Sequence, residues 1–125
     1  MRAPALLALL LAAPVASAVP APTTQVFEIT PDLRDCVSPI CGGWWISRVN
    51  HLSMRCADGT TASQCYVAEI DWPALGRDPT AEAALVSAAY NDQVVLRGGL
   101  TRVSYPVGVT LGVMTPVRAW IEVLP

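Results

Sequence analysis

Alternation of apolar and polar positions predicts a chain built mostly of β-strands. The segment 25–30 (QVFEIT) alternates in this way, and the segment 44–52 (WWISRVNHL) is rich in β-branched and aromatic residues. The segment 65–72 (CYVAEIDW) alternates most regularly, which is typical of a strand with one buried face. The side chains expected on that buried face are those of Tyr66, Ala68, Ile70 and Trp72.

A single helix is predicted over residues 79–90. Asp78 is a favourable N-cap, and Pro79 suits the first helical position because that residue needs no N–H partner. Glu82 lies in the first turn, where the positive end of the helix dipole stabilises a carboxylate. The helix is expected to end at Asn91.

Three further apolar segments follow the predicted helix. They are 93–104, 107–114 and 116–124. The Gly98–Gly99 pair inside the first segment predicts a bulge or a tight bend. In the second segment, the apolar face is expected to consist of Val107, Val109, Leu111 and Val113.

These elements predict an α+β fold. We expect a mostly antiparallel β-sheet of five or six strands, with one α-helix between the third and fourth strands. This order matches small five-stranded barrels of the oligonucleotide/oligosaccharide-binding type, so a partly closed, OB-like barrel is the more specific prediction. An antiparallel sheet that packs on one helix fits the same order.

The first 18 residues (MRAPALLALLLAAPVASA) predict a secretory signal peptide that is cleaved near Ala18. Their apolar run, 5–13, is shorter than the roughly 20 residues that a membrane-spanning helix needs. We therefore expect an exported protein, periplasmic or secreted, whose mature chain is not inserted in a membrane. Residues 19–25 are predicted to be a disordered lead-in, and 26–125 a single globular domain.

The charge of the chain argues against two classes of partner. Eight basic residues against ten acidic ones give a formal net charge of −2. All eight basic residues are arginines, and they form no basic run. Nucleic acids and anionic membranes are bound through such runs, so neither is an expected partner.

Four cysteines, Cys36, Cys41, Cys56 and Cys65, predict two disulfides, because an even number is expected in a small exported domain. Three connectivities are possible, and the sequence alone does not choose among them. The turn dipeptide Asp58–Gly59 favours a hairpin that joins Cys56 to Cys65 and leaves Cys36 to pair with Cys41. A four-thiolate zinc site fits less well, because eight residues separate the second pair.

The cysteine pattern also carries a resemblance to a known family. A Cys-x4-Cys-Gly-Gly-aromatic element covers 36–44, a Cys-x-Asp-Gly turn covers 56–59, and CYVAEIDW follows at 65–72. With Asn50, this combination resembles an uncharacterised family of exported bacterial domains, a domain of unknown function. The resemblance covers nearly the whole mature chain. It implies no activity, cofactor or site residue.

Because no stretch forms a catalytic, nucleotide or metal motif, we expect a non-catalytic binding or structural module without a cofactor. Its expected partner is a protein or glycan of the cell envelope or exterior. Exposed aromatic residues often mark contact surfaces, although each tryptophan here fits the core equally well. The predicted interaction surface consists of Pro39, Trp44, Trp45 and Trp120.

A second hypothesis is a secreted inhibitor of a hydrolase, such as a protease. The disulfide-closed loop 36–41 (CVSPIC) would be presented to the active site of the hydrolase. A constrained loop loses little conformational entropy on binding, which favours tight inhibition. The simpler interpretation is that the disulfide only holds the loop after the first strand.

Two enzymatic arrangements are less favoured. Glu69 and Asp71 could share a proton or a cation on one strand face. Their charge could instead be balanced across the sheet by Arg97, Arg102 or Arg118. A cysteine nucleophile with His51 would need a free thiol, which two disulfides do not leave. His51 is expected at an exposed strand end.

Overall fold

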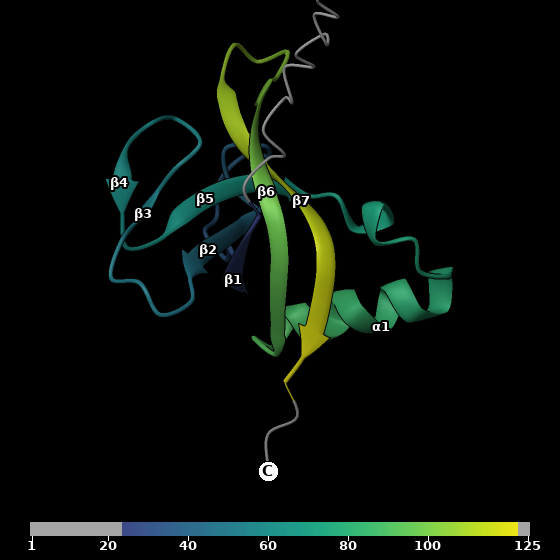
Figure 1. Cartoon of the computed structure of the whole chain (residues 1–125). Coiled ribbons are helices and arrows are strands. Elements are labelled where there is room, and N and C mark those ends of the chain that lie inside the picture. The colour runs from purple at the N-terminus through teal and green to yellow at the C-terminus, as the bar shows by residue number, and fades with distance from the viewer. Residues whose placement is uncertain (1–23, 123–125) are drawn as a thin grey trace, which may run out of the picture.

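The computed structural model describes residues 24–122, most of which form a five-stranded barrel with one α-helix (Figure 1). The barrel strands are β1 (Gln25–Pro31), β2 (Trp44–Arg48), β5 (Cys65–Ile70), β6 (Val94–Ser104) and β7 (Thr110–Ile121). The other elements are β3 (Met54–Arg55), β4 (Thr61–Ala62), the 3-10 helix η1 (Trp72–Leu75) and α1 (Pro79–Tyr90). The predicted signal peptide and most of the predicted lead-in lie outside the described residues.

The barrel is closed in the order β1-β2-β5-β7-β6, with β6 paired back to β1. Every neighbouring pair is antiparallel except β5 and β7, which run parallel. β1 pairs with β6 only as far as Gly98, whereas β7 pairs with β6 along its whole length. The far part of the β6–β7 hairpin therefore projects beyond β1, as Figure 1 shows.

The helix forms where the sequence predicts it. Asp78 caps α1 by accepting a hydrogen bond from the Ala81 N–H at 2.9 Å, and Pro79 is the first helical residue. Leu85 and Ala89 are the helix residues that are fully buried in the core. The bounds of α1, 79–90, agree with the prediction.

The predicted position of the helix among the strands is wrong. In chain order, α1 follows β5 rather than the third strand, because β3 and β4 form a separate hairpin between β2 and β5. Each of these two strands has only two residues, too few for a periodic pattern to form. Among the strands of the barrel alone, α1 joins the third to the fourth.

The core fills the barrel with side chains from every barrel strand. The largest fully buried ones are those of Phe27, Ile46, Val67, Leu85, Leu96 and Met114. Burying a side chain of this size contributes roughly 1.5–3 kcal/mol. The core therefore continues from β1 through β7 and onto α1.

The predicted buried face of β5 is wrong at the start of the strand and correct at Ile70. Val67 is fully buried and Tyr66 is only half-buried, the reverse of the expectation. An irregularity in the pairing with β7, between Val67 and Glu69, then shifts the phase so that Ile70 faces the core as well. The strand ends at Ile70, and Trp72 belongs to η1.

The last two predicted segments form one strand, β7, which continues through Pro116. Its buried residues are Gly112, Met114 and Pro116, so the predicted face with Leu111 and Val113 is also wrong. The sheet is irregular where the sequence predicts it, at Gly98, but the extra residue lies on the partner strand: Arg97 pairs with Arg118 and Gly98 with Pro116, which leaves Val117 of β7 unpaired. Gly98 pairs with Pro116, which places the residue without an N–H donor at the irregularity.

Gly43 provides a test of the packing between the start of β2 and β5. A Cβ atom at this position would overlap the Val67 carbonyl oxygen and lie 2.9 Å from the Ala68 Cα. We expect Gly43→Ala to lower the free energy of unfolding by roughly 2 to 3 kcal/mol, measured by urea denaturation of the oxidised protein. Gly99→Ala is the matched control, because nothing lies within 4 Å of a Cβ there. Equal losses in the two variants would contradict this account of Gly43.

Candidate functional site

The segment from Asp32 to Gly43, called the recognition loop below, connects β1 to β2 and contains the first disulfide. Cys36 pairs with Cys41, and Cys56 pairs with Cys65; the Cα atoms are 5.4 Å apart in each pair. The predicted connectivity is therefore confirmed. No cysteine is left free, so neither a thiolate nucleophile nor a thiolate zinc site is available.

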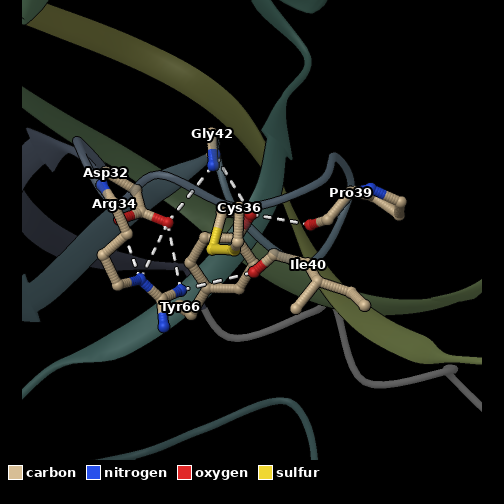
Figure 2. Close-up of a disulfide and its surroundings, with 9 residues drawn as sticks. Asp32, Arg34, Cys36, Pro39, Ile40, Gly42 and Tyr66 are labelled. Carbon is tan, nitrogen blue, oxygen red and sulfur yellow. Dashed lines mark hydrogen bonds and ion pairs between the residues drawn. A yellow bond between two sulfur atoms is a disulfide. The ribbon is translucent and has the colours of Figure 1, made fainter.

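A buried carboxylate holds the two ends of the recognition loop together (Figure 2). The Asp32 side chain has no exposed surface, and it accepts hydrogen bonds from Arg34 and from the Gly42 N–H at 3.2 Å. The Arg34 donors are its backbone N–H (3.1 Å), Nε (3.0 and 3.2 Å) and Nη2 (3.0 Å). The Asp32 N–H in turn donates to the Gly43 carbonyl at 2.9 Å. These bonds, those from the Arg34 side chain above all, lower the pKa of Asp32 to about 2.

Arg34 connects the recognition loop to the outer surface of the barrel. Its guanidinium donates from Nη2 to the Ile40 carbonyl at 3.3 Å. It also lies 4.8 Å from the centre of the Trp45 ring and 5.3 Å from that of Tyr66, within range of cation–π attraction. Hydrogen bonding to Asp32 raises the pKa of Arg34. One charged group therefore contacts the start of the loop, its end and the two strands beneath it.

Tyr66 supports the other side of the recognition loop from β5. Its hydroxyl donates to the Pro39 carbonyl at 2.7 Å and accepts from the Gly43 N–H at 3.1 Å. Burial is the largest cause of the raised pKa of this hydroxyl, which remains a donor at neutral pH. The loop backbone is thus fixed at its tip and at its junction with β2.

Three aliphatic side chains of the recognition loop face solvent. The exposed fractions are 84% for Leu33, 77% for Val37 and 50% for Ile40. Between the last two, the chain turns back, and the Cys41 N–H donates to the Val37 carbonyl at 3.2 Å. Exposed aliphatic side chains on a backbone with this many internal hydrogen bonds are typical of a contact surface.

The structure does not bring the predicted surface residues together. Trp44 is a core residue, 6% exposed and 5.7 Å from Trp72 between ring centres, which corrects its place in the predicted surface. Trp45 is half-buried beneath Arg34, and Pro39 is half-buried within the recognition loop. Trp120 lies outside the loop, on β7, with the Arg118 guanidinium 5.0 Å from its ring centre.

The residues that shape this site were largely missed from the sequence. The spacing of Asp32 and Arg34 is a local signal for an ion pair, but only the fold shows that the carboxylate is buried. The contact between Tyr66 and Pro39 joins residues 27 positions apart, which no local pattern indicates. Leu33 carries no signal in the sequence, because single exposed aliphatic residues are common.

The carboxylates considered for catalysis form no paired site. Glu69 and Asp71 are exposed, and within residues 24–122 the only ion pair joins Arg34 and Asp32. The expected ion pairs of these carboxylates with Arg97, Arg102 or Arg118 therefore do not form. Over the same residues, no cluster of three or more His, Cys, Asp or Glu is placed to hold a metal ion.

Two other side chains that could take part in proton transfer, those of His51 and Tyr105, lie near strand ends. His51 is exposed just after β2, with Nδ1 2.9 Å from the Val49 carbonyl oxygen, in agreement with the prediction. The Tyr105 hydroxyl is buried and makes no hydrogen bond to the described part of the chain. Burial, and then the charge of Glu69, raise the pKa of Tyr105. Neither residue lies beside a nucleophile.

These features define the chain as a disulfide-stapled β-barrel domain with a fixed loop between two strands. Residues 25–123 match the family described as Domain of unknown function (DUF6748), and the chain belongs to this family. No curated protein and no solved structure matches it. None of the helices between residues 24 and 122 is long and apolar enough to cross a membrane.

Asp32→Asn tests the contribution of the buried carboxylate. At pH 7 we expect the free energy of unfolding to fall by about 2 kcal/mol, since charged hydrogen bonds to Arg34 are lost. The pKa of Asp32 is lowered by folding, so its stabilisation is present above the unfolded pKa of about 4 and is lost as the pH falls towards 2. Urea denaturation should therefore show the two proteins converging in stability between pH 4 and pH 2.

The matched control for this test is Asp35→Asn, which removes an exposed carboxylate from the same loop. We expect it to change the stability by no more than about 0.5 kcal/mol at pH 7. A gap between the wild-type protein and Asp32→Asn that stays constant down to pH 2 would contradict the role assigned to the ionised carboxylate.

Proposed function

We propose that the protein is an exported, non-catalytic binding module whose contact surface is the recognition loop. The observation that carries this proposal is the exposure of Leu33, Val37 and Ile40 on a backbone fixed by Asp32, Arg34, Tyr66 and a disulfide. A loop that is already ordered loses little entropy when it binds. More of the free energy gained by burying its apolar side chains is therefore available as binding affinity.

Export is supported by the signal-peptide pattern of residues 1–18 and by the two disulfides, which suit an oxidising compartment. Once exported, the domain would meet envelope or extracellular components. The exposed aliphatic side chains of Leu33, Val37 and Ile40 favour a protein partner at this loop. Contact with a fully hydrated polar ligand would release little binding free energy, because it removes little apolar surface from water.

We further propose that the barrel is of the oligonucleotide/oligosaccharide-binding type. Its five strands, the helix between the third and fourth of them, and its β1–β2 loop all support this assignment. Barrels of this type bind ligands with the loop between their first two strands, which here is the recognition loop. This support is an analogy between folds and does not identify the ligand.

Inhibition of a hydrolase is the second candidate function, supported by the same rigid loop. Its weakness lies in the loop conformation, because the chain turns between Val37 and Cys41 instead of remaining extended. The 36–41 segment is therefore poorly shaped to lie along a protease cleft as a substrate strand does. Slow cleavage within 37–40 together with inhibition of a protease would favour this candidate over the first.

The binding proposal is tested with the triple variant Leu33→Ser, Val37→Ser, Ile40→Ser. The oxidised protein and this variant are each immobilised and used to capture proteins from the envelope and secreted fractions of the source organism. We expect the amount of the main captured protein to fall at least ten-fold with the variant, because the apolar contacts are lost while the loop backbone is unchanged. Quantitative mass spectrometry with isotope-labelled peptides measures the change.

A matched control removes three exposed aliphatic side chains outside the recognition loop, at Leu52, Val107 and Val117. This variant should capture as much partner as the unaltered protein. Equal capture by both triple variants would rule out the recognition loop as the contact surface. Circular dichroism and thermal melting of each variant confirm that the barrel is folded.

A further inference from the structure

A second surface lies at the opposite ends of β1 and β2 from the recognition loop. Two adjoining hollows of about 460 and 380 Å³ flank the turn after β2, and they share residues 48–51. Glu28 and Ser47 line the first hollow, and Gln25 and Arg97 line the second. We call these two hollows together the β2-end groove.

Arg97, which lines the second hollow, and its neighbour Arg118 on the adjacent strand have no carboxylate partner within residues 24–122. Arg97 on β6 and Arg118 on β7 are register partners, and both are exposed. Partners in an antiparallel pair have Cβ atoms about 5 Å apart, so two like charges there are unfavourable. Neither arginine forms an ion pair with any of residues 24–122, where Asp32–Arg34 is the only such pair.

An arrangement of this kind is stabilised by an anionic ligand. Two guanidinium groups in adjacent positions present planar, bidentate donors that match a carboxylate. Arg48 lines both hollows and adds a second positive charge, with that of Arg97, to the lining of the groove. A ligand carboxylate would replace the repulsion between Arg97 and Arg118 by two attractive contacts.

The remaining lining of the groove narrows the class of ligand. Ser47, Asn50 and Gln25 offer hydroxyl and amide groups, which hydrogen-bond to sugar hydroxyls. Glu28 and the net charge of −2 oppose a densely charged polyanion such as a nucleic acid. Trp120 on β7 lies outside this lining; it is 36% exposed, and the Arg118 guanidinium lies 5.0 Å from its ring centre.

We propose that the β2-end groove binds an acidic saccharide, with Arg97 and Arg118 contacting a carboxylate and the groove contacting hydroxyl groups. This site is separate from the recognition loop, because the two lie at opposite ends of β1. The start of β1 pairs with Arg97, whereas its last residue pairs with Trp44, which follows the recognition loop directly. The domain would then contact a saccharide at one end of the barrel and a protein at the other.

In the test, the full oxidised protein is titrated with trigalacturonic acid, and binding is measured by isothermal titration calorimetry and by changes in ¹H–¹⁵N NMR chemical shifts. Arg97→Gln and Arg118→Gln should each weaken binding by about ten-fold, the loss expected for one charged hydrogen-bonding partner. The control, Arg102→Gln, removes the same charge from the same strand and should leave affinity unchanged, as should the triple variant of the recognition loop. The methyl ester of the trisaccharide should bind at least ten-fold more weakly than the acid.

Thermal melting separates a binding role from a structural one. Arg97→Gln should melt at the same temperature as the unaltered protein or slightly above it, since the variant relieves a like-charge pair. The proposal is overturned by an absence of NMR shifts at millimolar trigalacturonic acid, or by equal weakening in Arg97→Gln and Arg102→Gln. Equally tight binding of tetraglutamate would assign the groove to acidic protein segments and would also overturn it.

Discussion

The parallel contact between β5 and β7 closes the barrel, and the remainder of the structure depends on it. Val67 and Met114 lie on the two strands and are both fully buried. Without this contact, β5 and β7 would each present an unpaired edge and the interior would open to water. Gly112, opposite Val67 in this pairing, leaves room for the turn between β3 and β4 to pack against β7, because a Cβ atom there would lie only 3.0 Å from the Ala57 Cβ. The same closure holds Tyr66 in place under the recognition loop.

Elements set by local chemistry could be predicted from the sequence, and those set by distant contacts could not. Asp78 and Pro79 begin α1 through groups on adjacent residues, so the helix bounds were correct. The prediction of which side chains of β5 are buried was wrong at Tyr66 and Val67, because the residues from Cys65 to Ala68 are all compatible with burial. The sequence also contains no sign of the irregularity that follows Val67. The hairpin that turns at Asp58–Gly59 was predicted, but its two strands, β3 and β4, were not, because two-residue strands exist only through their mutual pairing.

In the candidate site too, features set by local chemistry could be predicted from the sequence, and features set by distant contacts could not. The pairing of the four cysteines follows from their spacing and a turn dipeptide, and it was predicted. Whether Trp44 or Trp45 faces solvent depends on partners far along the chain. The rings of Trp72 and Tyr90 lie 5.7 and 4.9 Å from that of Trp44, which is buried. Trp45 is contacted by the Tyr66 ring at 5.5 Å and by the exposed Arg34 guanidinium, and it stays half-buried. Both tryptophans suit a strand, so their neighbours in the fold decide their roles.

Each disulfide encloses its own exposed turn, and this affects how the domain responds to cleavage of its backbone. The first spans residues 37–40 and the second residues 57–64, both of which contain exposed positions. If a peptide bond is hydrolysed in either turn, the two pieces stay covalently joined through sulfur, and no barrel strand is detached. These two exposed turns are therefore places where one cut neither releases a fragment nor separates the strands of the barrel.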